Sequence, residues 1–449
     1  MQQSPEMTIT EFFDKDYTQY ASYDVYRKIA NYIDGQKISA RKTLYTVMKI
    51  RLRDPKKVSQ LQSKISEETQ YLHGEGSLYG VIVGLAQDFP GSNNLPLLKR
   101  EGHFGDRLIP MASANRYIFT AMEPWLEKVF RPEDKPLLIE QEFEGDIIEP
   151  RFYVPTIPMI LVNGAEGLAT GFSQKILPRD PRKLANYIKN KLLGKVSRYN
   201  FMPYYEGFEG TIENTEGNTF VMRGIMKRVN TTTLRITEIP VGMSLAAYKT
   251  HLDKLEDKKE IKGYTDLSND GKFEFEIDVT RDTTRLKTDE MLMRMLKLIK
   301  TETENITVND EDLAICKFDC AQDLCDEFIM IKLEYMQKRK DYMIDQLIQM
   351  LAQLQSKLLF VKGVIDDSIK TRNKPHAQVE KQLDSIEKII RVNGDYSYLL
   401  GMPIGSLTKE KYDQLKKQIK ERKEELAALK KKTIEEMWIA DIDELLKVI

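Results

Sequence analysis

The sequence predicts a multidomain protein of mixed α/β class that ends in long antiparallel helices, and three observations carry this prediction. The chain has 449 residues, which is too many for a single hydrophobic core. Between residues 200 and 310, short runs alternate apolar and polar side chains, as half-buried strands do. Beyond residue 321, apolar residues recur at a spacing of about 3.5, as they do in helices that pack along one another.

The bulk composition is that of a soluble globular protein, with 41% hydrophobic and 31% charged residues. The 68 basic and 69 acidic residues nearly cancel, so any surface for nucleic acid must be a local patch. The spacing of the three cysteines matches no zinc-binding pattern. We find neither a secretory leader nor an apolar run long enough to span a membrane, so we expect a cytoplasmic protein.

The first 155 residues begin with a lead-in arm at 1–24 and continue with short helical patterns between glycine-rich loops. A basic helix start, Lys37–Lys42, follows the turn Asp34-Gly35. Such a helix could enter a DNA groove. The alternative is an ordinary solvated helix end.

The middle of the chain predicts a mixed α/β unit built on antiparallel strands with one solvated face. The expected strands are Gly210–Glu213, Thr219–Met222 and Thr233–Thr237, and the expected helices are Leu245–Leu255 and Glu290–Ile299.

The C-terminal part predicts a long helix out, a small helical knob at Val379–Val392, and a long helix back. Apolar residues step by three and four through 324–365 and again through 412–429, with lysine and glutamate on the other faces. A helix of roughly 40 residues reaches about 60 Å, which favours a spacer. The alternative is a plain helical hairpin without a function.

Arg116-Tyr117 is the pair with the clearest chemistry. A tyrosine hydroxyl can attack a phosphodiester while a neighbouring guanidinium neutralises the phosphate. A phenol with a pKa of about 10 attacks poorly unless its proton is drawn off. Because arginine and tyrosine are both common, the pair gains meaning only from its surroundings.

Several segments around this pair resemble, in consistent order over nearly the whole chain, the DNA breakage-reunion part of the type IIA DNA topoisomerases. Asp34–Lys42 resembles D-G-x-K-x-x-x-R-[KR], and Tyr71–Leu78 resembles Y-x-H-G-[DE]. Gly91–Asn94 with Gly102–Gly105 resembles the glycine-rich stretch before the nucleophile, and Leu161–Gly171 resembles L-V-N-G-x-x-G-[IL]-x-x-G.

The resemblance implies a winged-helix DNA-cleavage domain, an α/β tower, and a long antiparallel coiled coil with a helical dimer gate. The expected parts are an arm at 1–24, the winged-helix breakage-reunion domain at 25–155, the tower at 156–315, the stalk at 316–432 with its gate knob at about 366–408, and a C-terminal helix at 433–449.

The resemblance also implies roles for single residues. Tyr117 would be the nucleophile that forms a 5′-phosphotyrosyl bond, Arg116 the phosphate clamp, and His73 a phosphate contact or proton-transfer group. Leu168 stands where the family often has an isoleucine that wedges between base pairs. A buried core role for Leu168 is the alternative. Backbone phosphates would be held by Lys37, Arg41 and Lys42.

The chain shows no site of its own for the divalent metal or the ATP that the family uses. Glu144-Gly145-Asp146 looks like the opening of the acidic Toprim metal site, but it stands where breakage subunits carry a plain acidic loop. We therefore expect Mg²⁺ and ATP to be bound mainly by a separate large subunit with ATPase and Toprim domains. No metal ligand is assigned to this chain.

Among the branches of the family, the chain is most similar to the medium, DNA-cleaving subunit of T-even-type phages. We expect a homodimer on double-stranded DNA, in the host bacterial cytoplasm if a phage encodes it. A truncated bacterial or eukaryotic homologue and a DNA-binding scaffold without cleavage are the alternatives. Gly76 and Gly80 replace the serine and acid that anchor quinolones in gyrase-type enzymes, which predicts weak quinolone sensitivity.

Overall fold

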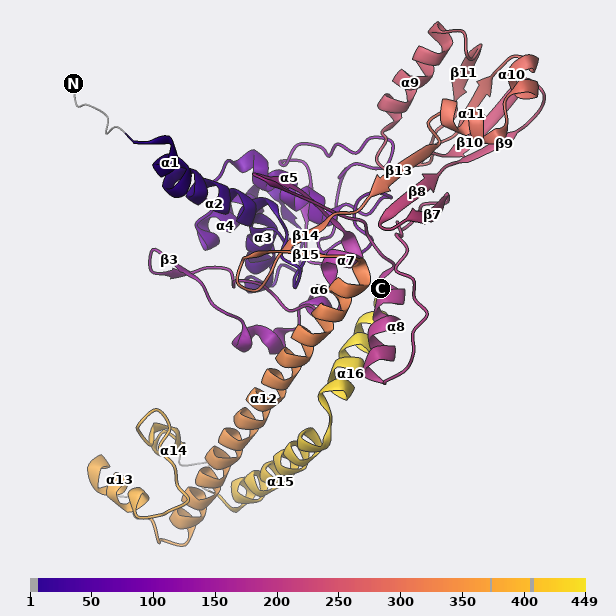
Figure 1. Ribbon diagram of the computed structural model, residues 1–449. Helices are drawn as coiled ribbons and strands as arrows, with labels where there is room; N and C mark the ends of the chain where they lie inside the picture. Colours follow the sequence, from indigo (N-terminus) through magenta and orange to yellow (C-terminus); the bar gives the residue numbers. More distant parts are fainter. Residues whose placement is uncertain (1–6, 372–373, 404–407) are drawn as a thin grey trace. The chain divides into compact units, whose positions relative to one another are not determined.

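The computed structural model describes residues 7–371, 374–403 and 408–449, which form two compact units. The first unit holds the chain up to Lys332 together with Ile439–Ile449, and the second holds Leu333–Trp438. Figure 1 labels many of the helices and strands of both units. Helices and antiparallel strands occur together, so the predicted mixed α/β class is confirmed.

The N-terminal part of the first unit is a group of helices joined to one short strand pair. β1 (Lys56–Lys57) immediately precedes α4 (Val58–Thr69) in the chain and pairs with β2 (Phe119–Thr120). In α4, buried residues recur every three or four positions, at Val58, Leu61, Ile65 and Thr69, as an amphipathic helix requires. The helices are α1 (Ile9–Glu11), the π-helical η1 (Phe12–Tyr17), α2 (Thr18–Lys28), α3 (Ile38–Lys49), α4 (Val58–Thr69) and α5 (Glu75–Ala86).

Short helices and two hairpins, β3–β4 and β5–β6, follow. Of these, α8 shows most clearly why it forms: the Asp180 carboxylate caps it by accepting from the backbone N–H groups of Arg182 and Lys183, and Pro181 opens its first turn. The elements are α6 (Leu126–Val129), the 3₁₀-helix η2 (Pro132–Leu137), β3 (Glu142–Phe143), β4 (Asp146–Ile147), α7 (Met159–Asn163), β5 (Ala165–Ala169), β6 (Phe172–Ile176) and α8 (Pro181–Leu192).

The last part of the first unit is built on antiparallel sheets. A four-stranded sheet has the order β11-β12-β10-β9, a three-stranded sheet has the order β13-β8-β7, and β14 pairs with β15. The strands are β7 (Thr211–Glu216), β8 (Thr219–Arg223), β9 (Ile225–Arg228), β10 (Thr233–Glu238), β11 (Gly263–Asp266), β12 (Phe275–Asp278), β13 (Ile299–Thr303), β14 (Ile306–Asn309) and β15 (Ile315–Phe318). The helices between them are α9 (Leu245–Asp257), α10 (Arg281–Leu286) and α11 (Asp289–Met295).

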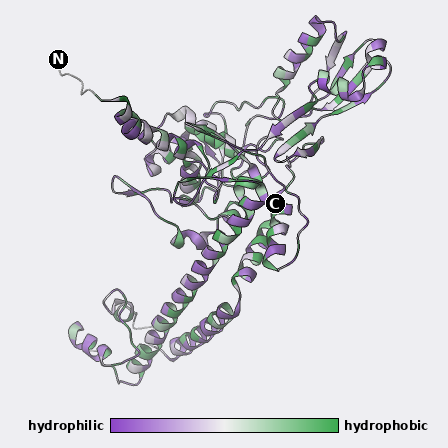
Figure 2. Ribbon diagram, viewed as in Figure 1, coloured by the Kyte–Doolittle hydropathy of each residue, from purple (hydrophilic) through white to green (hydrophobic). Residues whose placement is uncertain are grey.

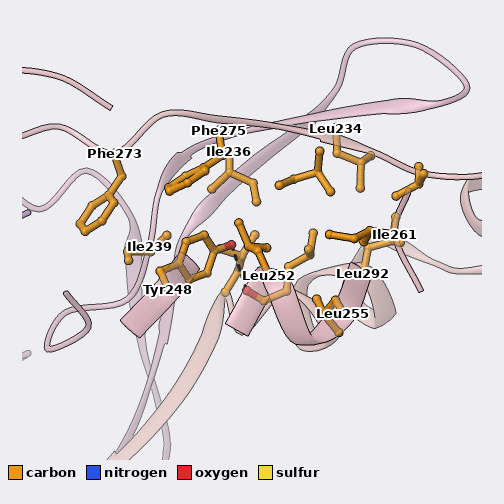
Figure 3. Packing of buried hydrophobic residues seen from close by; sticks show 14 residues of the cluster. Leu234, Ile236, Ile239, Tyr248, Leu252, Leu255, Ile261, Phe273, Phe275 and Leu292 are labelled. Atoms are coloured by element: carbon orange, nitrogen blue, oxygen red, sulfur yellow. Dashed lines mark hydrogen bonds between the residues drawn. The ribbon is translucent and has the colours of Figure 1, made fainter. Parts of the chain in front are cut away.

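One hydrophobic core joins the four-stranded sheet to α9 and α11 (Figure 3). Leu234 and Ile236 of β10 point into it, while Arg235 between them stays in solvent. Tyr248 and Leu252 cover these residues from α9. The strand alternation predicted from the sequence is therefore present.

The helix expected over Glu290–Ile299 is wrong at its C-terminal end. α11 stops at Met295, because Lys297 adopts the left-handed conformation with a φ of 53°, and β13 begins at Ile299. A residue in that conformation ends a helix. Apolar residues that looked like one more helical turn belong to the strand.

The second unit contains most of two long helices and a small helical cluster. Its longest element, α12, has 45 residues and covers the whole predicted run 324–365. Figure 2 shows α15 as almost wholly hydrophilic, and Leu415 and Ile419 are its buried residues. The helices are α12 (Ala321–Ile365), which begins in the first unit, α13 (His376–Asp384), α14 (Ser397–Leu400), α15 (Lys409–Lys431) and α16 (Ile434–Leu446), which ends in the first.

The knob between the long helices has its own core. It is less helical than expected, because α13 ends at Asp384 instead of continuing to Val392. Within the described ranges, no helix is both long and apolar enough to cross a membrane. The buried residues of the knob are Phe360, Ile369, Val379, Leu383, Ile389, Tyr396 and Leu399.

A buried ion pair joins the segment after β6 to the connection between β13 and β14. The side chains of Arg179 and Glu304 are each 1% exposed, and Nη2 lies 2.7 Å from Oε2. Arg179 Nε also donates to the carbonyl of Phe201, and Glu304 Oε1 accepts from the backbone N–H of Leu177. Because both side chains are shielded from water, each charge is stabilised mainly by the other.

We expect Glu304→Gln to lower the free energy of unfolding by about 3–5 kcal/mol, because it leaves a buried guanidinium without a counter-charge. The matched control is Glu274→Gln, which breaks a partly exposed pair with Arg235 and should cost about 1 kcal/mol or less. Denaturant unfolding of both variants measures the difference. Equal, small effects would contradict the prediction.

Candidate active site

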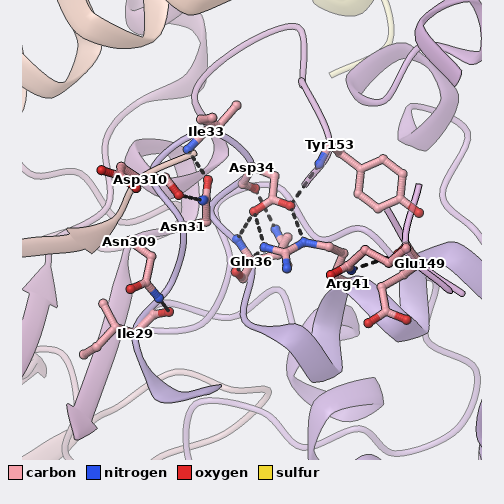
Figure 4. Close-up of polar contacts among 11 residues, drawn as sticks. Ile29, Asn31, Ile33, Asp34, Gln36, Arg41, Glu149, Tyr153, Asn309 and Asp310 are labelled. Carbon is pink, nitrogen blue, oxygen red and sulfur yellow. Dashed lines mark hydrogen bonds and ion pairs between the residues drawn. The ribbon is translucent and has the colours of Figure 1, made fainter. Parts of the chain in front are cut away.

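The turn before α3 is organised by Asp34, which is fully buried. Its carboxylate accepts two hydrogen bonds from Arg41, at 2.7 Å from Nε and 3.1 Å from Nη2 (Figure 4). It also accepts from the backbone N–H of Gln36 and, across the unit, from that of Tyr153 at 3.1 Å. One carboxylate thus holds a turn, a helix and a distant segment together.

Gly35 is required in this turn for two reasons. Its φ of 68° lies in the left-handed region that favours glycine. A Cβ atom built there would lie 2.4 Å from the backbone nitrogen of Ile160. The turn therefore packs directly on α7, and it delivers Lys37 to the N-terminal end of α3.

Arg41 and Lys42, both predicted to grip DNA phosphates, form ion pairs with carboxylates of the protein itself. Arg41 is 2% exposed, and its guanidinium is bonded to Asp34 and to the carbonyl of Gln36. Lys42 Nζ donates to the carbonyl of Thr69 and pairs with buried Glu149 at 2.9 Å. Both cations have a carboxylate partner, and the Arg41 side chain is more deeply buried than that of Lys42, at 2% against 12% exposed.

Lys37 is half-buried and differs from Arg41 and Lys42 in its hydrogen-bond partner. Its ammonium donates to the carbonyl of Glu166 at 2.7 Å, which brings it to the hairpin β5–β6. Burial lowers the pKa of Lys37. The bond to a neutral carbonyl leaves the charge of Lys37 without a carboxylate bonded to it, unlike those of Arg41 and Lys42.

Tyr117 lies in a tight turn just before β2. The turn closes with a hydrogen bond from the Tyr117 backbone N–H to the carbonyl of Ala114, at 2.9 Å. The start of α4 holds the turn from outside, because the backbone N–H groups of Val58 and Ser59 donate to the carbonyls on either side of Arg116-Tyr117. Both flanks of the candidate nucleophile are therefore fixed by the backbone.

The side chains of this turn remain open to solvent. The Tyr117 side chain is 64% exposed although it is large and aromatic. The Arg116 guanidinium carbon lies 4.9 Å from the centre of the Tyr117 ring, in a cation–π arrangement. The predicted pair thus has a reachable hydroxyl next to a positive charge.

His73 lies just before α5 and is half-buried. Its Nε2 atom is 3.1 Å from the hydroxyl of Tyr23, and its ring packs edge-on against Tyr71. Burial, followed by the positive charges of Arg27 and Lys42, lowers the pKa of His73. The imidazole is therefore neutral near pH 7.

Leu168 lies in the hairpin β5–β6 and is 77% exposed. This exposure excludes the alternative that Leu168 is a core residue. Phe172, which pairs with Ala169 on the neighbouring strand, is 44% exposed. The hairpin therefore presents apolar side chains to solvent, an unusual arrangement for groups that gain free energy from burial.

Metal-binding groups do not gather in the part of the chain that the structure describes. There, no three His, Cys, Asp or Glu side chains lie close enough together to hold an ion. Glu144 and Gly145 form the turn between β3 and β4, and the Asp146 carboxylate accepts from Gln70. Asp310 accepts from backbone N–H groups of its own turn. The described residues therefore do not fit the metal that the family implies.

Sequence reasoning missed two residues that contact the predicted groups. Tyr23 bonds to His73, and the hydroxyl of Tyr79 donates to the carbonyl of Ser113 in the segment before Tyr117. Neither has a signal in a single sequence. Their partners are 50 and 34 residues away, and only the fold brings them together.

Comparison with known proteins gives a consistent result over nearly the whole chain. The family model of the DNA gyrase/topoisomerase IV A-subunit matches residues 27–443. The chain is 33% identical over 452 residues to the mitochondrial DNA topoisomerase 2 of Dictyostelium discoideum, covering 98% of this chain and 35% of that protein. It is 32% identical to DNA topoisomerase 2 of Saccharomyces cerevisiae, covering 97% of this chain and 34% of that protein.

A solved structure agrees with these relatives. The DNA-binding, cleavage and re-ligation domain of Plasmodium falciparum topoisomerase II superimposes with a TM-score of 0.88 at 32% identity, covering 98% of this chain and 64% of that one. The chain spans about a third of the length of the curated relatives. The resemblance read from the motifs is confirmed at the level of the family. This chain belongs to the DNA gyrase/topoisomerase IV A-subunit family.

Proposed function

We propose that the chain cleaves and re-ligates double-stranded DNA within an ATP-dependent type II DNA topoisomerase. The observation that carries the proposal is the exposed Tyr117, 64% open to solvent, beside Arg116 on a turn held by α4. Family membership supports the same reading, since the matched solved structure is described as a DNA-binding, cleavage and re-ligation domain.

In the proposed reaction, Tyr117 Oη bonds to the scissile phosphorus as the bond from phosphorus to the 3′ oxygen breaks. The phenol loses its proton, the 3′ oxygen gains one, and the 5′ end stays attached as a phosphotyrosine. Re-ligation is the reverse reaction. Because one ester replaces another, neither step needs ATP for the chemistry itself.

Three further side chains act on the cleaved DNA strand. Arg116 neutralises the phosphate and the charge that develops in the transition state. His73, neutral near pH 7, contacts the phosphate or moves a proton. Lys37 contacts the DNA backbone, whereas Arg41 and Lys42 shape the turn from inside.

We assign Leu168 to wedge between base pairs and bend the duplex. An exposed leucine on a hairpin can replace stacking between two base pairs with contacts to its own side chain. This role accounts for an apolar side chain that the protein leaves uncovered.

For the architecture, we propose that the helices α3–α5 with β1–β2 act as a winged-helix cleavage domain and that the sheets β7–β13 form its tower. The long helices would pack as an antiparallel coiled coil and lead to a gate at the knob. Cutting both strands takes two tyrosines, so we propose a homodimer joined through that gate.

Mg²⁺ and ATP are proposed to bind elsewhere than on this chain. The described residues hold no cluster suited to a metal. A separate large subunit with ATPase and Toprim domains, as in the T-even-type phage enzymes, would supply both sites. The relatives instead carry the matching region inside one longer chain, so the same parts could be covalently joined. We place the active complex in the cytoplasm, that of a bacterial host if a phage encodes it.

Tyr117→Phe should abolish covalent protein–DNA adducts while DNA affinity stays unchanged, because phenylalanine has no oxygen to bond to phosphorus. Denaturing gels after trapped cleavage measure the adduct. Tyr20→Phe, an exposed tyrosine of α2, is the control. Equal adduct with and without the Tyr117 hydroxyl would favour a non-catalytic DNA-binding scaffold.

The purified chain, given only Mg²⁺, ATP and supercoiled plasmid, should relax none of it, because the metal and nucleotide sites lie on another polypeptide. Agarose gels resolve the topoisomers. Strand passage by the chain alone would contradict the proposed division of labour and would leave the assignment of Tyr117 intact.

Leu168→Ala should reduce the bend that the protein imposes on DNA, because alanine is too short to separate two base pairs. Energy transfer between dyes at the ends of a short duplex reports the bend. Val196→Ala, at a residue that is 92% exposed, controls for loss of an apolar surface group. Neither change should alter stability by more than about 0.5 kcal/mol. An unchanged bend would argue against the wedge.

A further inference from the structure

Helix α2 (Thr18–Lys28) touches two of the groups assigned above, although sequence reasoning treated it as part of a lead-in arm. One residue of it, Tyr23, has its hydroxyl 3.1 Å from His73 Nε2. The next residue, Asp24, bonds to the hairpin that carries Leu168. Two neighbouring side chains of one helix therefore hold groups that are almost 100 residues apart in sequence.

The helix is well anchored at this point. The Asp24 carboxylate is 6% exposed and accepts from both the backbone N–H and the hydroxyl of Thr170, each at 3.0 Å. It also pairs with Lys28 at 2.8 Å. A Cβ atom on Gly167 would lie 2.3 Å from the carbonyl oxygen of Lys28, so hairpin and helix backbones are in direct contact.

Tyr23 is held on the other side by a cation. The guanidinium carbon of Arg27 lies 5.5 Å from the centre of the Tyr23 ring, one helical turn away. The Tyr23 side chain is 48% exposed, so packing alone does not explain its place. Its hydroxyl is directed at a ring nitrogen from a helix that is fixed by Asp24.

We propose that Tyr23 is a positioning residue that fixes the ring orientation and the tautomer of His73 by donating its hydroxyl hydrogen to Nε2. The proposal deepens the proposed function, on which it rests for the role of His73. With Nε2 occupied as an acceptor, the ring proton of neutral His73 resides on Nδ1. Nδ1–H is then the group that His73 offers to a phosphate oxygen.

The charges around His73 agree with a neutral ring. Arg27 on α2 and Lys42 on α3 are both cations, and with burial they disfavour imidazolium. Tyr71 contributes an aromatic edge from the same segment as His73. A neutral imidazole has one donor and one acceptor, and a tyrosine hydroxyl on the acceptor removes the choice between tautomers.

The first test observes the tautomer itself and needs no activity. Nitrogen-15 NMR of the chain labelled at histidine, with His73 assigned by comparison with His73→Ala, should show Nε2 unprotonated and Nδ1 protonated at neutral pH. In Tyr23→Phe, the Nε2-protonated tautomer should become populated. Tyr20→Phe on the same helix should leave the spectrum unchanged. An unchanged His73 signal in Tyr23→Phe would overturn the proposal.

The second test measures the rate of adduct formation under conditions in which the wild-type protein forms it. Tyr23→Phe should slow the reaction about fivefold, the effect expected for the loss of one neutral hydrogen bond, with unchanged DNA affinity. Added to His73→Ala, it should slow the reaction no further, because its effect passes through His73. Additive effects of the two changes would overturn the proposal.

The two tests separate this inference from the proposed function. If adducts never depend on Tyr117, the proposed function fails, and the NMR result still decides whether Tyr23 sets the tautomer. If Tyr117→Phe abolishes adducts while Tyr23→Phe changes neither rate nor spectrum, only the inference about Tyr23 fails.

Discussion

The buried ion pair between Asp34 and Arg41 is the constraint on which the first unit most depends. The two side chains are 0% and 2% exposed, so each charge relies on its partner and on hydrogen bonds for the solvation that water would supply. Asp34 also accepts from the backbone N–H of Tyr153, 119 residues away. The nearby ion pair of Lys42 and Glu149 also links α3 to the segment before α7, across 107 residues of sequence. These polar links between distant segments tie the turn and helix α3 to the segment before α7.

The predicted site residues fall into two groups according to their exposure. Arg41, Lys42 and Asp34 are held inside the protein, where their charges fix geometry. Tyr117 and Leu168 are 64% and 77% exposed, and each is held by backbone hydrogen bonds within its turn or hairpin. An exposed side chain is not stabilised by its own burial. Backbone hydrogen bonds on either side of these residues therefore fix their positions.

Much of this could be predicted from the sequence, because local patterns determine local structure. Alternation of apolar and polar residues located β10, and the three-and-four spacing located α12 over its whole predicted length. Prediction failed where the local pattern had two readings. The apolar residues after Met295 continue the spacing of a helix. The helix nevertheless ends there, because Lys297 is in the left-handed conformation, and the strand β13 follows. The sequence also carried no sign that Arg41 and Lys42 pair with carboxylates of the protein, Asp34 and Glu149.

The family, most of the succession of strands and helices, and the pairing of Arg116 with Tyr117 can all be read from the amino-acid sequence. These follow from residue types in a fixed order, which is information that a linear chain carries. The partners of Arg41 and Lys42, the exposure of Leu168 and the contact of Tyr23 with His73 across 50 residues arise when the chain folds. Burial and partnership are relations between segments far apart in the chain. They come into existence when the backbone folds and water leaves the space between those segments.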